Sequence, residues 1–149
     1  MAARRPVAQD EAFAEVCRRH GMKVTPQRVE IYRELAASKE HLDAEEVYRR
    51  VRKRLPNVSL DTVYRTLNRL EEEGVIGRME GPGGVMRFDP DTERHHHWMC
   101  VRCGAIKDFT CDESQAPRPP KEVLAWGKLL SWQMLARGVC AGCLKRGRS

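Results

Sequence analysis

The stretch around which this chain is organised reads His95-His96-His97-Trp98-Met99-Cys100-Val101-Arg102-Cys103-Gly104. One tight turn at Cys100 and Cys103 can aim both thiolates at a single ion, and a second Cys-x-x-Cys pair, Cys140 and Cys143, lies near the C-terminus. Two such pairs predict a tetrahedral structural zinc site, with two disulfides or four unrelated buried cysteines as the alternatives. Because 36 residues separate the pairs, the ion would fasten the end of a small domain to its middle.

The histidines of the same stretch carry a second pattern. His95 and His97 are two residues apart, so on an extended strand both imidazoles lie on one face while His96 points to the other. The pair could share a second metal ion. From spacing alone, a solvated polar run or a tag-like run stays an equal alternative.

The length of the chain and its cysteines limit the number of domains and the cellular compartment that can be expected. The 149 residues allow one ordinary domain or two small ones, and we favour two. No apolar run approaches the roughly 18 residues of a membrane span, and Arg4 and Arg5 precede no apolar leader segment. We therefore expect a soluble cytoplasmic protein, in which reducing conditions favour metal binding over disulfides. Cys17 is expected to pack in the core, and Cys111 has no assigned role.

The formal net charge is +6, and the one concentrated basic run extends from Arg49 to Arg54. Such a run can bind nucleic acid, but it is equally typical of a solvated helix face. The distribution of charge therefore says less about function than the motifs around it do.

The N-terminal half predicts four helices followed by a strand hairpin. The first runs from near Asp10 to Gly21 with Phe13, Val16 and Cys17 inward, and the others start after the N-caps Thr25, Asp43 and Ser59. In the second helix Val29, Tyr32, Leu35 and Ala36 are expected to be buried. Strands over 75–80 and 85–89, joined by Gly81-Pro82-Gly83-Gly84, complete a winged helix-turn-helix.

The fourth helix has two different faces. Leu60, Val63, Leu67 and Leu70 repeat at helical spacing and should be buried, whereas Asp61, Tyr64, Arg65 and Asn68 share the opposite face. In a winged helix this element enters the major groove. Tyr64, Arg65 and Asn68 are therefore predicted to contact bases and phosphates.

The C-terminal half predicts strands over 95–99, 105–109 and 129–135, a short helix over 122–126 and a frayed tail over 145–148. The fold class is α+β, with an N-terminal winged helix-turn-helix followed by a small α/β dimerisation domain stapled by zinc. We predict a DNA-binding domain over 1–89, a hinge over 90–94, and a dimerisation and metal-binding domain over 95–149.

Several motifs resemble the ferric-uptake-regulator family of metal-dependent dimeric repressors, over almost the whole chain. They are Lys23-Val24-Thr25-Pro26-Gln27-Arg28, Ser59 to Leu67, Arg87-Phe88-Asp89, the stretch from His95 to Cys103, Ile106-Lys107-Asp108-Phe109 and Gly138-Val139-Cys140-Ala141-Gly142-Cys143. The resemblance implies a regulatory metal held by His41, Asp89, His95, His97 and Asp108. It also implies that Lys23 and Arg28 flank the recognition helix on DNA.

The acids of that ligand set resemble one branch of the family. Aspartate at both Asp89 and Asp108 is similar to the peroxide-sensing branch, PerR, where iron-uptake regulators usually carry glutamate. Many iron-uptake regulators carry a further metal site with extra histidines and an acid. Here Arg94 and His96 stand at two of its positions, a departure that supports the peroxide-sensing branch. The sequence around Trp132 departs from the family pattern, so the dimer surface can differ in detail.

The function expected from these features is a metal-dependent homodimeric repressor that binds double-stranded operator DNA and is not an enzyme. Each chain would hold one structural Zn2+ and one regulatory Fe2+ or Mn2+, and peroxide would act as a signal by oxidising His41 or His95. The alternatives are an iron-, zinc- or manganese-uptake regulator of the same family, a non-haem iron enzyme, and a constitutive zinc-stapled DNA-binding module.

Overall fold

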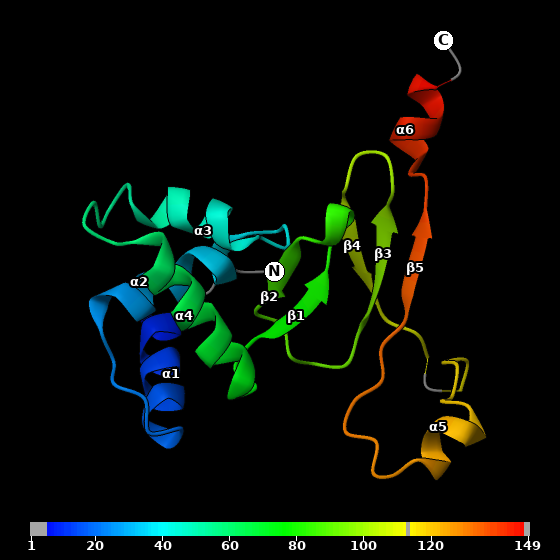
Figure 1. Cartoon of the computed structure of the whole chain (residues 1–149), viewed down its shortest axis with the longest axis horizontal. Helices are drawn as coiled ribbons and strands as arrows, with labels where there is room; N and C mark the ends of the chain where they lie inside the picture. Colours follow the sequence, from blue (N-terminus) through cyan, green and yellow to red (C-terminus); the bar gives the residue numbers. More distant parts are fainter. Residues whose placement is uncertain (1–5, 113, 148–149) are drawn as a thin grey trace. The chain divides into compact units, whose positions relative to one another are not determined.

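The computed structural model describes residues 6–112 and 114–147 and separates into two compact units, Met1–Thr92 and Glu93–Ser149 (Figure 1). The division falls within the segment 90–94 that the sequence predicts as a hinge. Arg4, Arg5 and Arg148, which the sequence arguments mention, lie outside the described residues. No helix among the described residues is both long enough and apolar enough to cross a bilayer.

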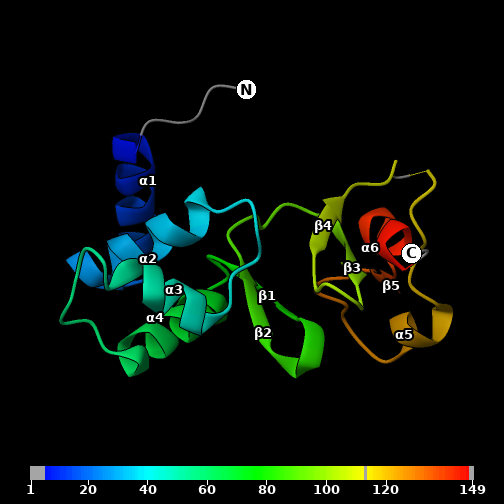
Figure 2. The same cartoon turned by 90° about the horizontal axis from the view of Figure 1, so that it is seen from above.

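The described residues of unit 1 form four helices and a two-stranded antiparallel sheet (Figure 2). Its elements are α1 (Pro6–Arg19), α2 (Pro26–Ala37), α3 (Ala44–Val51), α4 (Leu60–Glu72), β1 (Gly77–Glu80), a 3-10 turn (Pro82–Gly84) and β2 (Met86–Asp89). The predicted winged helix-turn-helix is confirmed. The start near Asp10 was placed too late, because α1 already begins at Pro6.

Local capping fixes where three of these helices begin. The side chains of Thr25, Asp43 and Ser59 accept backbone N–H groups three residues ahead, at 3.2, 2.8 and 3.1 Å. Each cap satisfies an N–H that has no partner within its own helix. All three predicted N-caps are confirmed.

Unit 1 surrounds a continuous apolar core. Its buried side chains include Phe13, Cys17, Ile31, Leu35, Leu42, Val47, Val51, Val63, Leu67, Leu70 and Phe88. Burial also raises the pKa of the Cys17 thiol, in agreement with a packing role. The expected stripe of α2 is partly wrong, because Val29 and Tyr32 are only partly buried whereas Glu30 and Ile31 are buried.

Ion pairs within unit 1 explain both the buried Glu30 and the basic run. Glu30 accepts from Arg33 at 2.5 Å and from Arg54 at 2.7 Å, which compensates for the burial of its carboxylate. At the start of the run, Arg49 and Arg50 both pair with Glu46. Arg49 and Arg50 are therefore ion-paired on α3, whereas the run from Arg52 to Arg54 lies beyond the end of that helix.

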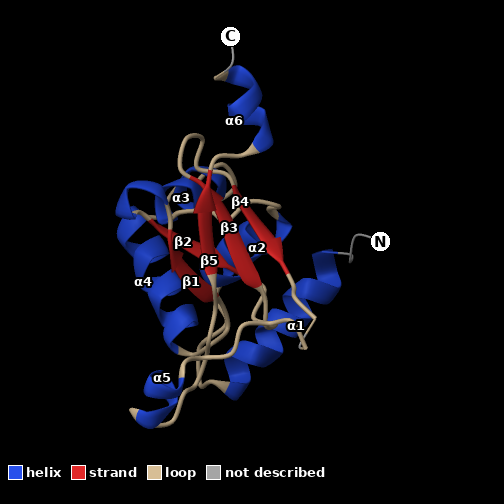
Figure 3. Ribbon diagram, turned by 90° about the vertical axis from the view of Figure 1, so that its right-hand side faces the viewer, coloured by secondary structure: helices blue, strands red, loops and turns tan. Residues whose placement is uncertain are grey.

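Unit 2 is built on a three-stranded sheet in the order β4-β3-β5 (Figure 3). Its elements are β3 (His96–Cys100), β4 (Ile106–Phe109), α5 (Lys121–Ala125), β5 (Leu135–Gly138) and α6 (Ala141–Arg146). Strand β4 is antiparallel to β3, whereas β5 is parallel to it, with Trp98 opposite Ala136. This sheet confirms the predicted α+β class.

Two expectations for unit 2 were wrong. The strand predicted over 129–135 begins only at Leu135, because pairing with β3 starts there and Leu130 upstream is 86% exposed. The tail expected to be frayed from Lys145 is helical through Arg146, since Cys140 caps α6 by accepting from Cys143 N.

Candidate metal centres and nucleic-acid interface

The four cysteines of the two Cys-x-x-Cys pairs converge within unit 2. Cys100 ends β3, Cys103 lies in the turn that follows, Cys140 caps α6 and Cys143 lies in its first turn. The Sγ atoms of these four residues all lie within 4.8 Å of one another. The sequence prediction that these residues form one cluster is thus matched by the structure.

The sulfur spacing distinguishes a zinc site from a disulfide. The Sγ atoms of Cys103 and Cys140 are 3.7 Å apart, and all the cysteines are free. Tetrahedral Zn–S bonds of about 2.3 Å put neighbouring sulfurs about 3.8 Å apart, whereas a disulfide requires about 2.05 Å. The four residues therefore fit one zinc ion.

Hydrogen bonds to sulfur favour the thiolate form at two of the four cysteines, whereas at Cys103 the Ala105 N–H is outweighed by the sulfurs of Cys100 and Cys140, which raise the pKa of that thiol to about 11. Cys100 Sγ accepts from the backbone N–H groups of Cys103 (3.5 Å) and Cys140 (3.3 Å), which lower its pKa to about 6. Arg146 donates to Cys143 Sγ at 3.2 Å and lowers the pKa of that thiol. Such outer hydrogen bonds orient the ligands of a metal and tune its affinity.

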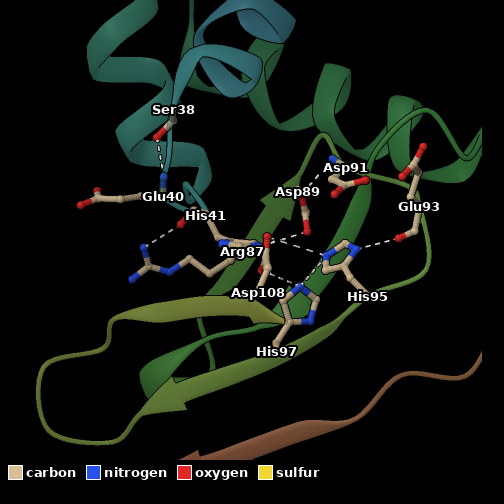
Figure 4. A network of polar contacts seen from close by, with 10 residues as sticks. All are labelled: Ser38, Glu40, His41, Arg87, Asp89, Asp91, Glu93, His95, His97 and Asp108. Atoms are coloured by element: carbon tan, nitrogen blue, oxygen red, sulfur yellow. Dashed lines mark hydrogen bonds and ion pairs between the residues drawn. The ribbon is translucent and has the colours of Figure 1, made fainter. Parts of the chain in front are cut away.

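Unit 2 also carries three of the predicted regulatory ligands on one side of its sheet. The Nε2 atoms of His95 and His97 are 3.0 Å apart, and the carboxylate of Asp108 on β4 lies 3.4 Å from His97 Nε2 and 4.0 Å from His95 Nε2 (Figure 4). Antiparallel pairing places Asp108 directly opposite His97. Both histidines are buried, at 4% exposure each.

His96 confirms the expected alternation. Its Nδ1 accepts from Met134 N at 3.1 Å, and its ring packs against Phe109, so it serves the connection to β5. His95 itself precedes the first residue of β3.

Unit 1 holds the other two predicted regulatory ligands. His41 lies in the loop before α3, Asp89 ends β2, and His41 Nε2 is 3.0 Å from Asp89 Oδ2 (Figure 4). The second carboxylate oxygen of Asp89 accepts from Asp91 N at 2.9 Å, which fixes the orientation of the group. The imidazole and carboxylate groups found in each unit are of the kind that suits Fe2+ or Mn2+.

A basic cleft of about 540 Å³ runs through unit 1 between the start of α2 and the exposed face of α4. Lys23, Arg28 and Arg65, three of the predicted DNA contacts, line it. Tyr64 and Asn68 are exposed on α4 outside the lining, and Tyr64 is 43% exposed. Sequence reasoning missed Arg69, which also lines the cleft and could have been found from its position one turn beyond Arg65.

Neighbouring acids hold the cations of this cleft in place. Arg65 Nε lies 3.0 Å from Asp61, and Arg69 lies 2.6 Å from Glu73. The Arg28 guanidinium instead donates to the backbone oxygen of Lys23 at 2.7 Å. Such a row of cations suits a phosphate backbone.

Comparison with known proteins decides the family. The model of the ferric uptake regulator family matches residues 19–125. The chain belongs to the ferric uptake regulator family. A peroxide-responsive repressor, PerR, from Staphylococcus epidermidis is 30% identical over 138 residues, which cover 93% of this chain and 91% of that protein.

Solved structures of the ferric uptake regulator family agree in fold. The Helicobacter pylori regulator Fur, described as having three functional metal binding sites, superposes with a TM-score of 0.73 and 30% identity over 94% of each chain. A zinc-bound manganese uptake regulator gives a TM-score of 0.64 and 32% identity, covering 85% of this chain and 96% of that one. The resemblance inferred from the sequence is therefore confirmed, and the chain is a metal-dependent regulator of this family.

Proposed function

We propose that this regulator is a cytoplasmic homodimer that represses transcription by binding double-stranded operator DNA with Fe2+ or Mn2+ bound, and that releases the operator when peroxide oxidises a ligand histidine. The observation that carries the proposal is the division of the ligand set. His41 and Asp89 are in unit 1, whereas His95, His97 and Asp108 are in unit 2. An ion held by all five would tie the DNA-reading unit to the other.

Ligand chemistry sorts the two metals in this proposal. Zinc prefers the four thiolates, whereas three imidazoles and two carboxylates suit Fe2+ or Mn2+. Each chain would then hold one structural zinc and one regulatory ion. By thermodynamic reciprocity, operator DNA must tighten binding of the regulatory ion by the same factor as the ion tightens DNA binding, typically about 5- to 150-fold.

Operator contact is assigned to the exposed face of α4 and the adjoining cleft. Arg65, Tyr64 and Asn68 would reach base edges and phosphates from the helix, while Lys23 and Arg28 would contact the flanking backbone. The four cations of the cleft supply the charge that nonspecific affinity requires. No reaction on an organic substrate forms part of this role, so we infer a regulator without enzymatic turnover.

The peroxide response follows from the chemistry of the ligands. Fe2+ held by these residues would supply the redox chemistry that cleaves the O–O bond of peroxide, so that one oxygen is added to an imidazole and the other leaves as water, whereas Mn2+ would do so far less readily. His41 and His95 are the residues at risk, by the resemblance to the peroxide-sensing branch. An imidazole that has gained oxygen binds metal poorly, so the tie between the units fails. Support comes from the two aspartates, Asp89 and Asp108, and from the 30% identity to PerR proteins.

An uptake regulator for manganese is the second candidate, because a manganese uptake regulator is 32% identical to this chain. The deciding experiment measures operator binding with Fe2+ and with Mn2+, each before and after brief peroxide exposure, followed by mass spectrometry. We expect loss of binding with iron alone and a gain of one oxygen atom on His41 or His95. The exposed His20 on the same chain is the internal control and should stay unmodified.

Equal loss of binding with both metals, or oxidation confined to cysteines, would refute peroxide sensing and leave a metal-responsive regulator. Operator binding that survives removal of the regulatory metal would instead favour a constitutive zinc-stapled module. Turnover of an organic substrate would revive the non-haem iron enzyme.

A further inference from the structure

Neither the proposed operator contacts nor the proposed metal ligands include Arg87 of β2, so this cation still has no assigned role. Its side chain is half-buried, and its Nη1 donates to the backbone oxygen of His41 at 3.1 Å (Figure 4). The guanidinium therefore contacts the loop that presents His41, two residues from the position of Asp89 on the same strand. Burying a cation is unfavourable unless it has a hydrogen-bond partner, and the His41 carbonyl supplies one.

Consecutive residues of β2 hold this loop against the strand. Beside the Arg87 contact, Phe88 N donates to Leu42 O at 2.9 Å, and Asp89 Oδ2 lies 3.0 Å from His41 Nε2. The contact of Phe88 is made by the backbone, and Asp89 belongs to the proposed ligand set. Arg87 is therefore the residue whose replacement can loosen the loop while leaving both the strand and the ligands in place.

The base of the wing packs against the stem of Arg87. A Cβ added at Gly81 would lie 2.8 Å from Arg87 Cγ, 3.0 Å from its Nε and 2.9 Å from Val85 O. The φ of Gly81 is −92°, which any residue adopts, so the requirement for glycine is close approach. The buried Nε of Arg87 has no acceptor within 6–112 and 114–147. The wing turn thus confines the stem, and the head of the side chain holds the His41 loop.

We propose that Arg87 is a positioning residue that presets the His41 and Asp89 pair for the regulatory ion and connects this pair to the wing. The inference rests on the proposed function, because it assigns the ion to that pair. A ligand loop that is already ordered has less conformational entropy to lose on binding. Loss of an outer partner of a metal ligand typically weakens metal binding about 10- to 100-fold.

The test compares Arg87→Met with Arg78→Met in the full zinc-loaded chain. Arg78 is an exposed arginine on β1 of the same sheet, so its replacement removes the same charge without touching the His41 loop. Binding of Mn2+ is followed through the electron paramagnetic resonance signal of the free ion. Arg87→Met should weaken Mn2+ binding about 10- to 100-fold, Arg78→Met should leave it unchanged, and Arg87→Lys should restore part of it, because an ammonium can still donate to the carbonyl.

A second measurement reads the loop directly, without the regulatory ion. The Phe88 amide should exchange its hydrogen faster in Arg87→Met than in the wild type, because its acceptor Leu42 O lies in the loosened loop. Gly81→Ala should give the same two changes by displacing the arginine stem. This variant serves if Arg87→Met does not fold, as judged by its zinc content and circular dichroism.

Wild-type affinity for Mn2+ in Arg87→Met, or equal weakening in Arg78→Met, would overturn the positioning role alone. Faster Phe88 exchange without weaker Mn2+ binding would also overturn it, since the loop would then be irrelevant to the ion. If His41→Ala bound Mn2+ with wild-type affinity, His41 would not be a ligand. That result would overturn the proposed function together with this inference.

Discussion

Unit 1 and unit 2 solve the problem of stability in different ways. Unit 1 buries a continuous set of large apolar side chains, from Phe13 in α1 to Phe88 in β2. Among the described residues of unit 2, the buried apolar side chains are Met99, Cys100 and Cys143, next to three buried histidines. Trp126 and Leu130 of unit 2 are exposed by 94% and 86%.

The difference shows where each unit obtains its free energy of folding. Fully burying one Leu, Val or Phe side chain contributes about 1.5–3 kcal/mol, and unit 1 does this many times. Unit 2 lacks such a core among its described residues and instead gathers four cysteines, whose contribution to folding depends on a bound metal. Unit 1 should therefore respond to changes in packing and unit 2 to changes in metal.

The largest expected effect is that of Cys140→Ser in unit 2. Removing one thiolate should abolish zinc binding, whose apparent free energy in small zinc domains is about 10–16 kcal/mol at neutral pH. Unit 2 should unfold and the proposed dimer should dissociate, while unit 1 keeps its fold. Zinc content, sedimentation and amide exchange at Leu67 of unit 1 measure these three outcomes.

Cys111→Ser is the matched control for Cys140→Ser. Cys111 is a free, half-buried cysteine of the same unit and lies outside the sulfur cluster. It should leave zinc content and dimerisation unchanged. A zinc-free Cys140→Ser protein with unit 2 still folded would break the contrast between the units, because unit 2 would then have a sufficient core of its own.

The next largest effect is expected from Leu67→Ala in unit 1. Leu67 is fully buried in α4, and truncating such a side chain leaves a cavity that costs about 2–5 kcal/mol. The thermal transition of unit 1 should move to lower temperature while zinc content stays at one ion per chain. Val24→Ala, at a residue that is 43% exposed, should move the transition little. Zinc loss in Leu67→Ala would show that the two units unfold together.

Sequence reasoning predicted most of the elements of unit 1, because the signals there are local. N-caps such as Ser59, a helix-ending glycine such as Gly74 with φ of +70°, and the apolar face of α4 each act within a few residues. In unit 2 the start of β5 depends on its parallel pairing with β3, where His97 lies opposite Leu135. That partner is far away in the sequence, so a local pattern could not place the strand.

The candidate sites also differ in whether their sequence signals are local. The Cys-x-x-Cys spacing carries the chemistry of the zinc site within the sequence itself, and the structure gathers its four sulfurs. Asp89 and Asp108 came from family resemblance, because a single acid that shares no regular spacing with the histidines gives no signal of its own. Arg87 was overlooked as a positioning residue, since its contact with His41 O spans 46 residues.

The smallest energetic effect is expected on the exposed face of α4, where unit 1 should change function without changing stability. Arg65 is 74% exposed and pairs with the equally exposed Asp61 one turn away, a pair worth about 0.3–0.5 kcal/mol. Arg65→Ala should therefore unfold at the wild-type temperature. Its operator binding should weaken by about 1–3 kcal/mol, the value of one good base contact, with a smaller loss on unrelated DNA.

Arg69→Gln tests whether a second cation of the same cleft contacts a phosphate rather than a base. If Arg69 neutralises a phosphate, its replacement should lower the affinity for all sequences alike and reduce the slope of log K against log salt by roughly 0.9. Arg49→Gln is the matched control, because Arg49 pairs with Glu46 on α3 and does not line the cleft. Normal operator binding by Arg65→Ala would show that α4 is not the reading helix. If the unfolding temperature of Arg65→Ala fell as much as that of Leu67→Ala, the exposed face of α4 could not be changed without disturbing the core of unit 1.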